Sequence, residues 1–501
     1  MTSPPSPPAP SVPRLTSSNA SEDYRFPPGL KRPLHAYVFK AWVKLGSPIL
    51  LFEYLLKTYG NIACYRFMGT LIVFINDPEY IREILVTQAS SFVKERTVRR
   101  MKILLGEGLI TSDDPIHMRQ RKIAAPAFHR QRIAAYGDQI VACARNQSEE
   151  WSRNTQADPL NPQLQEVDIS AASMKLSLEI VARTLFDTEV TADIRSINDE
   201  VNTIMNLYNF IVAFPRIESF LHLPIPGIIK FRRSKARLDA VVDRLILEHR
   251  EAAARGEPDK GDLLSMLMAS RYEPDDAKEV SGGHNGVSGE QEGMSDEQVR
   301  DEVLTIFLAG YETVANGLAW TWYLLSQNPE AEARLHAELD NVLGTGVERR
   351  LPTLADYADL QYTEQVFAES MRLYPPAWAM GRMSTAPVEL GPYRIPAGAH
   401  FFFSQYIMGR DAQYFPDPLR FDPDRFTPKN KAARAKFTSF PFGGGRRQCI
   451  GESFAWMEGV FSIATIAQRW RMIYLGVSPP EVQAKITLRP KDPLMMRLVP
   501  R

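Results

Sequence analysis

The chain has 501 residues, of which 44% are apolar and 24% charged, and Lys plus Arg equal Asp plus Glu at 59 each. This average composition excludes collagen-like and low-complexity proteins, and the zero net charge offers no general attraction to nucleic acid or to an anionic membrane. The three cysteines are odd in number, far apart and never arranged as CxxC, which argues against a disulfide framework and a zinc site.

The N-terminal segment is rich in Pro and Ser and lacks the basic start and apolar stretch of a signal peptide. We therefore expect residues 1–33 to form a disordered Pro-rich tail. No apolar run reaches the roughly 18–20 residues that span a bilayer, because Glu53 interrupts the best candidate, residues 48–56. These features predict a soluble, cytoplasmic protein without a transmembrane anchor.

Two β-like runs follow the tail, at residues 62–67 and 71–75. Residues 68–70 between them have the composition of a hairpin turn. Pro78 is expected to lie in the first turn of a short helix, where its missing N–H has no consequence.

The middle of the chain, residues 115–270, has the pattern of successive helices. The Gly- and Ser-rich residues 271–294 predict an irregular connection within one domain. Ser295 and Gln298 then form a capping box, which begins a long helix expected over 296–326. That helix is apolar on most faces, so we expect it to be buried.

The C-terminal third begins with two more predicted helices, at 329–345 and 363–374. A Pro-rich, partly stranded region is expected over 375–440. The last helix is expected to begin at Ile450, and strand-like pieces follow from residue 471.

A glycine-rich loop carries the clearest chemical pattern, F-x-x-G-x-R-x-C-x-G over Phe442–Gly451. A cysteine thiolate on haem iron donates electron density that favours O–O cleavage, and it needs hydrogen-bond donors around the sulfur. Glycines 443–445 allow backbone conformations closed to other residues, and a helix beginning at Ile450 would place its positive end beside Cys449. A buried structural cysteine is the alternative. The full pattern resembles the haem-binding signature of the cytochrome P-450 superfamily.

This resemblance implies a mainly α-helical fold, with one domain over residues 34–501 that contains small β-sheets. Haem b would lie buried between the 296–326 helix, the family's I helix, and the cysteine loop. Cys449 would be the axial ligand of the haem iron. The signature assigns four residues to cofactor binding: Phe442, Arg447, Cys449 and Gly451.

Glu369-Ser-Met-Arg372 resembles the family's ExxR motif, in which the two charges share one helix face. Residues 421–426 resemble the PERF region, with Asp424 where Glu is usual. The resemblance implies that Arg425 joins Glu369 and Arg372 in a structural triad on the proximal side. Taken alone, the Glu–Arg pair would be read as an ordinary surface salt bridge.

Ala309-Gly-Tyr-Glu-Thr313 lies in the middle of the long predicted helix and resembles the family's oxygen-activation motif. The reaction needs two protons inside an apolar site, and a hydroxyl together with a carboxylate can deliver them. This catalytic role falls to Glu312 and Thr313. Ala309 and Gly310 would contact the haem, with Gly310 leaving room over the iron. The alternative is a helical Thr whose hydroxyl is satisfied locally.

His117-Met-Arg-Gln-Arg121 resembles the C-helix segment that holds the haem propionates, with His117 where many members have Trp. His117 and Arg121 are one helical turn apart, so both would face the haem edge. Arg382, after two prolines, resembles another propionate partner. An ordinary surface charge is the alternative for each Arg.

The resemblance implies a monooxygenase that inserts one atom of dioxygen into a lipophilic substrate, which is a fatty acid or another lipid such as a terpenoid. The overall pattern is closer to fatty-acid hydroxylases than to short bacterial terpene enzymes. Substrate contacts are expected from 92–112, 200–230, 296–326, 376–381 and the surroundings of Leu494. Their apolar members are Phe92, Tyr208, Phe210, Phe214, Ala377, Trp378, Met380 and Met495. The loop at 220–228 is expected to pack on the protein, although it could touch a membrane.

Electrons are expected from a separate protein, because no GxGxxG or Walker motif for a fused reductase is present. Basic residues concentrate in segments expected on the proximal face: Arg119, Lys122, Arg130, Arg132, Lys429, Lys431, Arg434, Lys436 and Arg446. This clustering indicates an acidic ferredoxin or flavodoxin with its own reductase. Ordinary solvated charge is the alternative. We expect a monomer that does not bind nucleic acid.

The sequence leaves two alternatives to a monooxygenase open. One is a haem-thiolate enzyme that uses peroxide, a class that often loses the acid–alcohol pair at Glu312 and Thr313. The other is a non-catalytic haem sensor or electron carrier, which would not need a proton relay.

Overall fold

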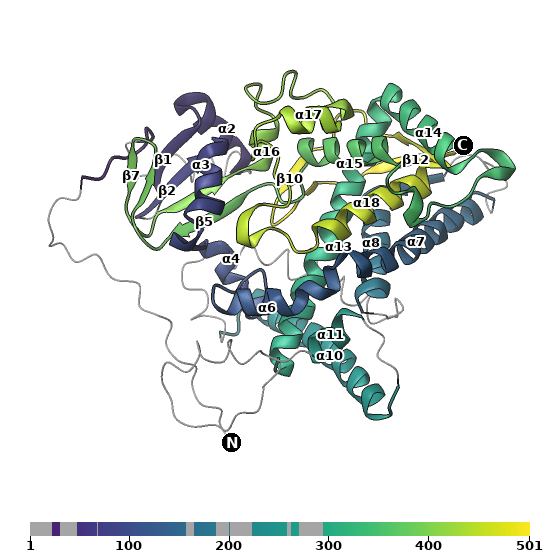
Figure 1. The fold of residues 1–501 in the computed structure, drawn as a ribbon, viewed down its shortest axis with the longest axis horizontal. Coiled ribbons are helices and arrows are strands. Elements are labelled where there is room, and N and C mark those ends of the chain that lie inside the picture. Colours follow the sequence, from purple (N-terminus) through teal and green to yellow (C-terminus); the bar gives the residue numbers. More distant parts are fainter. Residues whose placement is uncertain are drawn as a thin grey trace.

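The computed structural model describes residues 23–30, 48–67, 69–156, 165–186, 200, 223–257, 262–269 and 294–501. The fold is mainly α-helical. In Figure 1 the strands of the main sheet gather at the left of the molecule, and the long helices occupy the middle and right. The predicted connection at 271–294, except for Met294, lies outside the described residues, and so does the predicted turn residue Met68.

The longest helix, α13 (Asp296–Gln327), runs through the middle of the molecule (Figure 1) and is buried along most of its length. It packs against α8 (Ile169–Leu185), α10 (Pro226–Ala254), α15 (Gln361–Leu373) and α18 (Glu452–Ala467). A helix that is apolar on nearly every face can be buried in this way at little cost.

The other helices cover this core or join it to the sheets. They are α2 (Pro48–Tyr59), α3 (Pro78–Arg82), α4 (Arg96–Arg100), α5 (Lys102–Leu105), α6 (Ile116–Ala124), α7 (Arg130–Gln156), α11 (Leu263–Ala269), α14 (Pro329–Leu343), α16 (Gln405–Gly409) and α17 (Pro428–Ala433). Single turns of other helix types include η1 (Glu83–Thr87), η7 (Pro423–Phe426) and η8 (Gly445–Arg447).

The main sheet has the strand order β1-β2-β8-β5-β3. Its strands are β1 (Ile62–Phe67), β2 (Thr70–Ile75), β3 (Phe92–Lys94), β5 (Met380–Ser384) and β8 (His400–Phe403). β1 and β2 form the predicted antiparallel hairpin, in which Phe67 pairs with Thr70. The pairing of β3 with β5 is antiparallel and sets Lys94 opposite Arg382, which brings two cations from distant segments together.

Residues 23–30, counted with the predicted tail, contact this part of the fold. Arg25 exchanges two backbone hydrogen bonds of 3.0 Å with Arg394, and the Leu30 N–H donates to the Cys64 carbonyl at 3.0 Å. The predicted disorder is therefore wrong for residues 23–30, which are attached to the strands, while residues 1–22 and 31–33 of the predicted tail lie outside the described residues.

Smaller sheets complete the fold. One has the order β4-β12-β9, and two hairpins pair β6 with β7 and β10 with β11. The strands are β4 (Gln165–Asp168), β6 (Val388–Leu390), β7 (Tyr393–Ile395), β9 (Trp470–Tyr474), β10 (Val482–Ala484), β11 (Leu488–Pro490) and β12 (Met495–Pro500). β4 lies in a stretch for which only helices were predicted, because its partner β12 is far away in the sequence.

Two predicted helix starts are confirmed. Pro78 is the first residue of α3, and Ser295 with Gln298 forms the capping box of α13. The last helix begins at Glu452 rather than at Ile450, because a turn separates the cysteine loop from the helix. Among the described residues, no helix combines the length and apolar character that crossing a membrane requires.

Candidate active site

The loop that holds Cys449 depends on glycine at three successive positions. Gly443 and Gly445 have φ angles of 74° and 69°, a region that favours glycine, as predicted. A Cβ on Gly445 would lie 2.0 Å from the Leu85 carbonyl oxygen. The prediction is wrong for Gly444, whose φ of −176° suits any residue. Its constraint is space, because a Cβ there would lie 2.5 Å from the Phe437 ring.

Backbone hydrogen bonds hold Cys449 in its loop. The Gly451 N–H donates to Sγ, and the Cys449 N–H donates to the Phe442 carbonyl at 2.9 Å. Burial by the surrounding protein raises the pKa of the Cys449 thiol, an effect that the Gly451 N–H opposes. Backbone donors to sulfur are what a thiolate ligand requires.

Aromatic rings of α15 and α18 pack against the cysteine loop. The Phe442 ring lies 5.6 Å from the Trp456 ring of α18, and Trp456 lies 5.8 Å from Phe367 of α15. Phe442 therefore packs between the cysteine loop and the helical core. Trp456 was not identified from the sequence, because its spacing is that of any core-facing helix residue.

Arg447 and Arg446 tie the loop to the residues before α6. Arg447 Nη1 donates to the Ser112 carbonyl at 2.8 Å, and Nη2 lies 3.2 Å from Asp114 Oδ1. Arg446 also binds Asp114. The side chain of Arg447 is only 9% exposed, so its charge is largely removed from water.

Four basic side chains form what we call the basic cluster: Lys94, His117, Arg382 and Arg447. Burial and the charge of Arg447 lower the pKa of Arg382 to about 10. Burial, helped by Arg382 and Arg447, holds the pKa of Lys94 well below its usual range. Burial, Arg447 and Lys94 lower the pKa of His117 to about 4. The cluster therefore destabilises its own positive charge.

The basic cluster fits an anionic group. Within the described part of the chain, no carboxylate lies at ion-pair distance from Arg382 or Lys94. The buried Nδ1 of His117 makes no hydrogen bond there, although Asp114 Oδ1 lies 3.3 Å away. Two carboxylates placed among these side chains would give Arg382 and Lys94 anionic partners and would give His117 a hydrogen-bond partner. Haem b carries two propionates, which are carboxylates of this kind.

Arg121 contacts the cysteine loop. Its Nη1 donates to the Gln448 carbonyl at 2.7 Å, directly before Cys449. Its positive charge lowers the pKa of the Cys449 thiol against the larger effect of burial. The predicted contact of Arg121 with the haem edge beside His117 stays a prediction, and the structure adds a contact of its guanidinium with the cysteine loop.

On α13, the Thr313 hydroxyl donates to the Ala309 carbonyl at 2.7 Å, the local bond that the sequence allowed for. Gly310 lies next to α8. An ideal Cβ on Gly310 would lie 3.1 Å from Val181 Cγ2, so this glycine permits the close approach of α8. The predicted place of Gly310 over the haem iron stays a prediction.

Glu312 is buried and faces the tip of the β10–β11 hairpin. Thr487 Oγ1 donates to Glu312 Oε1 at 2.6 Å. Burial raises the pKa of Glu312, while the bond from Thr487 and the charges of Arg489 and Lys485 oppose that rise. Glu312 and Thr313 thus meet different partners, as expected for neighbouring helix positions about 100° apart.

The structure brings Glu369, Arg372 and Arg425 together. Arg372 donates to both carboxylate oxygens of Glu369 at 2.6 and 2.7 Å, and Arg425 Nε lies 3.5 Å from Glu369 Oε1. Asp424, where the family has Glu, forms a bidentate ion pair with Arg334 of α14 at 2.7 and 2.8 Å. This ion pair links η7 to α14.

Some predicted substrate contacts belong to the core. The Phe92 ring packs edge-on against Phe401 with a centroid distance of 5.4 Å. Trp378 is buried, and its Nε1 donates to the Lys485 carbonyl at 2.8 Å. Tyr208, Phe210, Phe214 and residues 220–222 lie outside the described residues. The rest of the predicted 220–228 loop leads into the first turn of α10.

Sequence reasoning missed two polar residues of the site, Lys94 and Thr487. Lys94 follows an ordinary strand pattern, and only its register opposite Arg382 brings it to the cluster. Thr487 lies 175 positions from Glu312, in a hairpin without a distinctive motif. Neither residue had a local signal that could have identified it.

A mainly helical fold, with a cysteine whose sulfur accepts from the Gly451 N–H and which lies next to a buried basic cluster, fits a haem-thiolate protein. The family model described as Cytochrome P450 matches residues 27–497. The chain is 34% identical over 417 residues to "Cyclooctatin synthase" of Streptomyces melanosporofaciens, covering 83% of this chain and 84% of that protein. It is 32% identical over 433 residues to "Pentalenene oxygenase" of Streptomyces avermitilis, covering 86% and 88%. The chain therefore belongs to the cytochrome P450 family and is a haem b monooxygenase.

Solved structures agree on the fold. "Retinoic acid bound cyanobacterial CYP120A1" superposes with a TM-score of 0.77 at 22% identity, covering 95% of this chain and all of that one (100%). A cytochrome P450 titled CYP102L1 has a TM-score of 0.76 at 24% identity, covering 91% and 98%. The predicted fold class is confirmed.

Proposed function

We propose that this monooxygenase hydroxylates a large lipophilic substrate of terpenoid type, with electrons from a separate iron–sulfur protein. The overall reaction is RH + O₂ + 2e⁻ + 2H⁺ → ROH + H₂O. The observation that carries the reaction type is the Cys449 loop, in which the Gly451 N–H donates to the sulfur. The terpenoid class is supported by the names of similar enzymes, cyclooctat-9-en-7-ol 5-monooxygenase and pentalenene oxygenase.

Bound haem b would supply the iron on which dioxygen is activated. Cys449 would hold the iron, and the residues of the basic cluster would bind the propionates. Arg121 would stabilise the negative sulfur through the Gln448 carbonyl contact and its own charge. Thr313 would hold a proton beside the site of oxygen reduction, and Glu312 would pass protons towards it.

The substrate proposal is tested by incubating the reconstituted enzyme under ¹⁸O₂ with pentalenene and, separately, with palmitate. The expected result is a hydroxylated cyclic product carrying one ¹⁸O atom, formed faster than any fatty-acid product. Faster oxidation of palmitate would contradict the terpenoid assignment. Product formed only with added hydrogen peroxide would favour the peroxide-using alternative, and no product under either condition would favour a non-catalytic haem protein.

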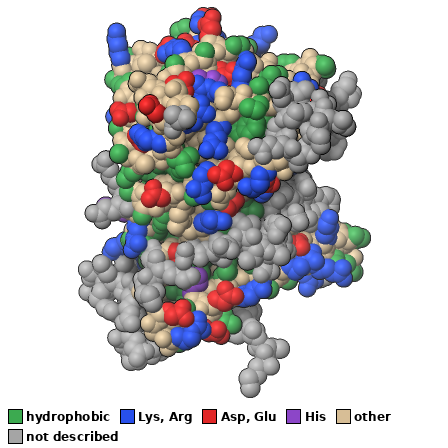
Figure 2. Space-filling model, turned by 90° about the vertical axis from the view of Figure 1, so that its right-hand side faces the viewer, with side chains coloured by type: hydrophobic (Ala, Val, Ile, Leu, Met, Phe, Trp, Pro, Cys, Tyr) green, Lys and Arg blue, Asp and Glu red, His purple; other side chains and the backbone are tan. Residues whose placement is uncertain are grey.

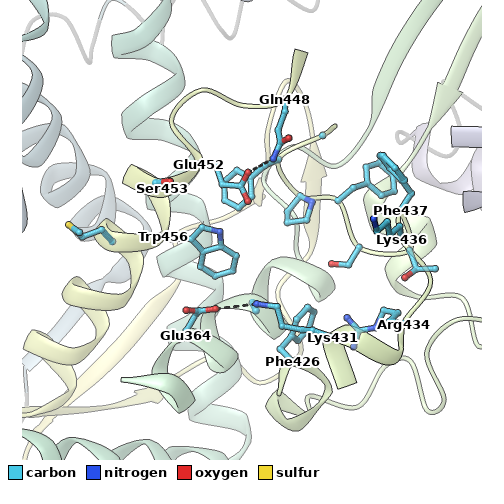
Figure 3. A pocket seen from close by; sticks show the side chains of 18 of the residues that line it. Glu364, Phe426, Lys431, Arg434, Lys436, Phe437, Gln448, Glu452, Ser453 and Trp456 are labelled. Carbon is cyan, nitrogen blue, oxygen red and sulfur yellow. Dashed lines mark hydrogen bonds and ion pairs between the residues drawn. The ribbon is translucent and has the colours of Figure 1, made fainter. Parts of the chain in front are cut away.

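A groove next to the cysteine loop fits an electron donor. It has a volume of about 790 Å³ and lies between α18 and residues 426–442. Figure 3 shows Glu452, Ser453 and Trp456 on one wall, opposite the segment with Lys436 and Phe437. Figure 2 shows the side of the molecule that lies at the right in Figure 1, and on that side acidic and basic side chains are interspersed.

Not every basic residue near the groove is available to a partner. Lys431 pairs with Glu364 at 3.3 Å, and Arg434 turns inward to lie over the rings of Phe415 and Phe426. The exposed side chains of Lys429 and Lys436 are better placed to attract an acidic ferredoxin. A flavodoxin is the alternative donor.

Changing both Lys429 and Lys436 to Glu is expected to raise the KM for an acidic ferredoxin about tenfold at low salt, because a like charge replaces an attractive one. The difference from wild type should shrink as ionic strength rises. Lys230→Glu on α10, at the opposite end of the molecule in Figure 1, is the matched control and should leave the KM unchanged. Equal effects of the two changes would show that the groove is not the docking surface.

We also propose a cytoplasmic monomer whose catalytic domain covers residues 34–501. The separated cysteines, odd in number, are compatible with a reducing compartment. Light scattering coupled to size-exclusion chromatography tests the monomer.

A further inference from the structure

The tip of the β10–β11 hairpin is held firmly against α13. Trp320 Nε1 of α13 donates to the Leu488 carbonyl at 3.3 Å, and Trp378 Nε1 donates to the Lys485 carbonyl at 2.8 Å. The Leu488 N–H donates to the Pro376 carbonyl at 2.9 Å. These contacts lie on both sides of Thr487 in the sequence, so the position of its hydroxyl is set by its neighbours.

Thr487 is the side-chain partner of a buried acid. Its Oγ1 donates to Glu312 Oε1 at 2.6 Å, a short bond of the kind that a charged acceptor forms. Glu312 and Thr487 are 6% and 5% exposed. Asn316, one turn after Glu312, donates to the Glu312 carbonyl at 2.8 Å and reaches Thr487 Oγ1 at 3.4 Å. The hydroxyl is therefore bound on two sides.

The same hairpin carries charges that act on this acid. Arg489 and Lys485 flank Thr487 and are both half-buried. Their positive charges favour the ionised form of Glu312, against the effect of burial. Tyr311, on the same helix as Glu312, is the other titratable group whose charge couples to it. The hairpin thus connects a buried carboxyl group to a partly exposed basic edge.

We propose that Thr487 is a positioning residue of the proton relay, which holds the Glu312 carboxyl against the β10–β11 hairpin and makes that hairpin the route by which protons enter. This inference rests on the proposed function, in which Glu312 supplies protons for oxygen reduction. In the described conformation Glu312 binds Thr487, while Thr313 binds Ala309. The hydrogen bond that the Glu312 carboxyl accepts therefore leads to the hairpin and not to Thr313, which supports proton uptake on the hairpin side.

The test compares Thr487→Val, Thr487→Ser and the wild type. Valine keeps the shape of the side chain but removes the donor, whereas serine keeps the hydroxyl. Thr321→Val is the matched control, because the buried Thr321 hydroxyl donates to the Gly317 carbonyl on the same helix. Coupled product formation should fall about tenfold in Thr487→Val, with a larger solvent deuterium isotope effect on kcat and little change in KM. Thr487→Ser should restore both.

A second readout does not depend on turnover. The carboxyl stretch of Glu312, assigned by its loss in Glu312→Gln, is followed by infrared spectroscopy as the pH is changed. Loss of the Thr487 donor should move the midpoint of Glu312 upwards by about one pH unit, because the carboxylate loses a stabilising bond. Thr487→Ser and Thr321→Val should leave it in place.

The outcomes distinguish failure of the Thr487 proposal from failure of the proposed function. A shifted carboxyl midpoint together with wild-type coupling and isotope effect would overturn the role of the hairpin in proton entry. An unshifted midpoint in Thr487→Val would overturn the positioning role itself. Wild-type enzyme that forms no product with electrons and dioxygen would instead refute the proposed function, whatever the infrared result.

Discussion

Replacing Arg372 by alanine is expected to lower the free energy of unfolding by about 3–5 kcal/mol, because it leaves a buried carboxylate without its main partner. The side chains of Arg372 and Glu369 are 1% and 0% exposed. Arg372 also donates to the Pro418 carbonyl at 2.7 Å, so the change removes the link between α15 and the loop before η7. Urea unfolding of the haem-loaded protein measures the effect, and haem retention is expected to fall with it.

The control is Arg334→Ala, which removes an ion pair of the same bidentate geometry from the surface. The side chains of Arg334 and Asp424 are 54% and 47% exposed, so we expect a loss of no more than about 1 kcal/mol. If Arg372→Ala yields too little folded protein, Glu369→Gln preserves volume and can be measured in its place. A stability loss as small as that of Arg334→Ala, in either variant, would contradict the structural role of the triad.

Replacing Thr313 by valine is expected to separate consumption of reductant from product formation. The hydroxyl lies in the middle of α13 and is held by the Ala309 carbonyl at 2.7 Å, so valine removes the donor while keeping the shape. General acid–base catalysis contributes about 10²–10⁴-fold, and we expect product per electron pair to fall at least about tenfold. Oxygen consumed without product should appear as hydrogen peroxide or water.

Thr313→Ser is the control for this second change, because it keeps the hydroxyl on the same helix turn. We expect its coupling to stay within about twofold of wild type, since only a methyl group is lost. Peroxide assays and product quantification on the same samples provide the measurement. Intact coupling in Thr313→Val would show that the hydroxyl serves only its local bond to the helix.

Local patterns predicted the parts of the site that neighbouring residues determine. The glycines around Cys449 could be identified because a sharp loop requires positive φ at Gly443 and Gly445. The pairing of Glu369 with Arg372 could be predicted because helix geometry brings positions i and i+3 to one face. The hairpin at β1 and β2 could be predicted from two β-like runs around a turn.

Other features depended on contacts between distant segments. Lys94 joins the basic cluster only through the register of β3 on β5, and Thr487 reaches Glu312 from a hairpin that its own sequence does not place. The contacts of Gly310 with α8 and of Arg121 with the cysteine loop could not be predicted for the same reason. Val181 of α8 occupies the space beside the glycine, and the Gln448 carbonyl attracts the guanidinium.

The ligation of haem iron by Cys449 is tested most directly by the absorption spectrum of the reduced protein with bound carbon monoxide. Wild type and Cys64→Ser, which changes a cysteine away from the loop, should both show the red-shifted Soret band of thiolate ligation. Cys449→His should lose that band. A band at the imidazole-like position in wild type would show that Cys449 is not the ligand, and the monooxygenase mechanism derived from it would be wrong.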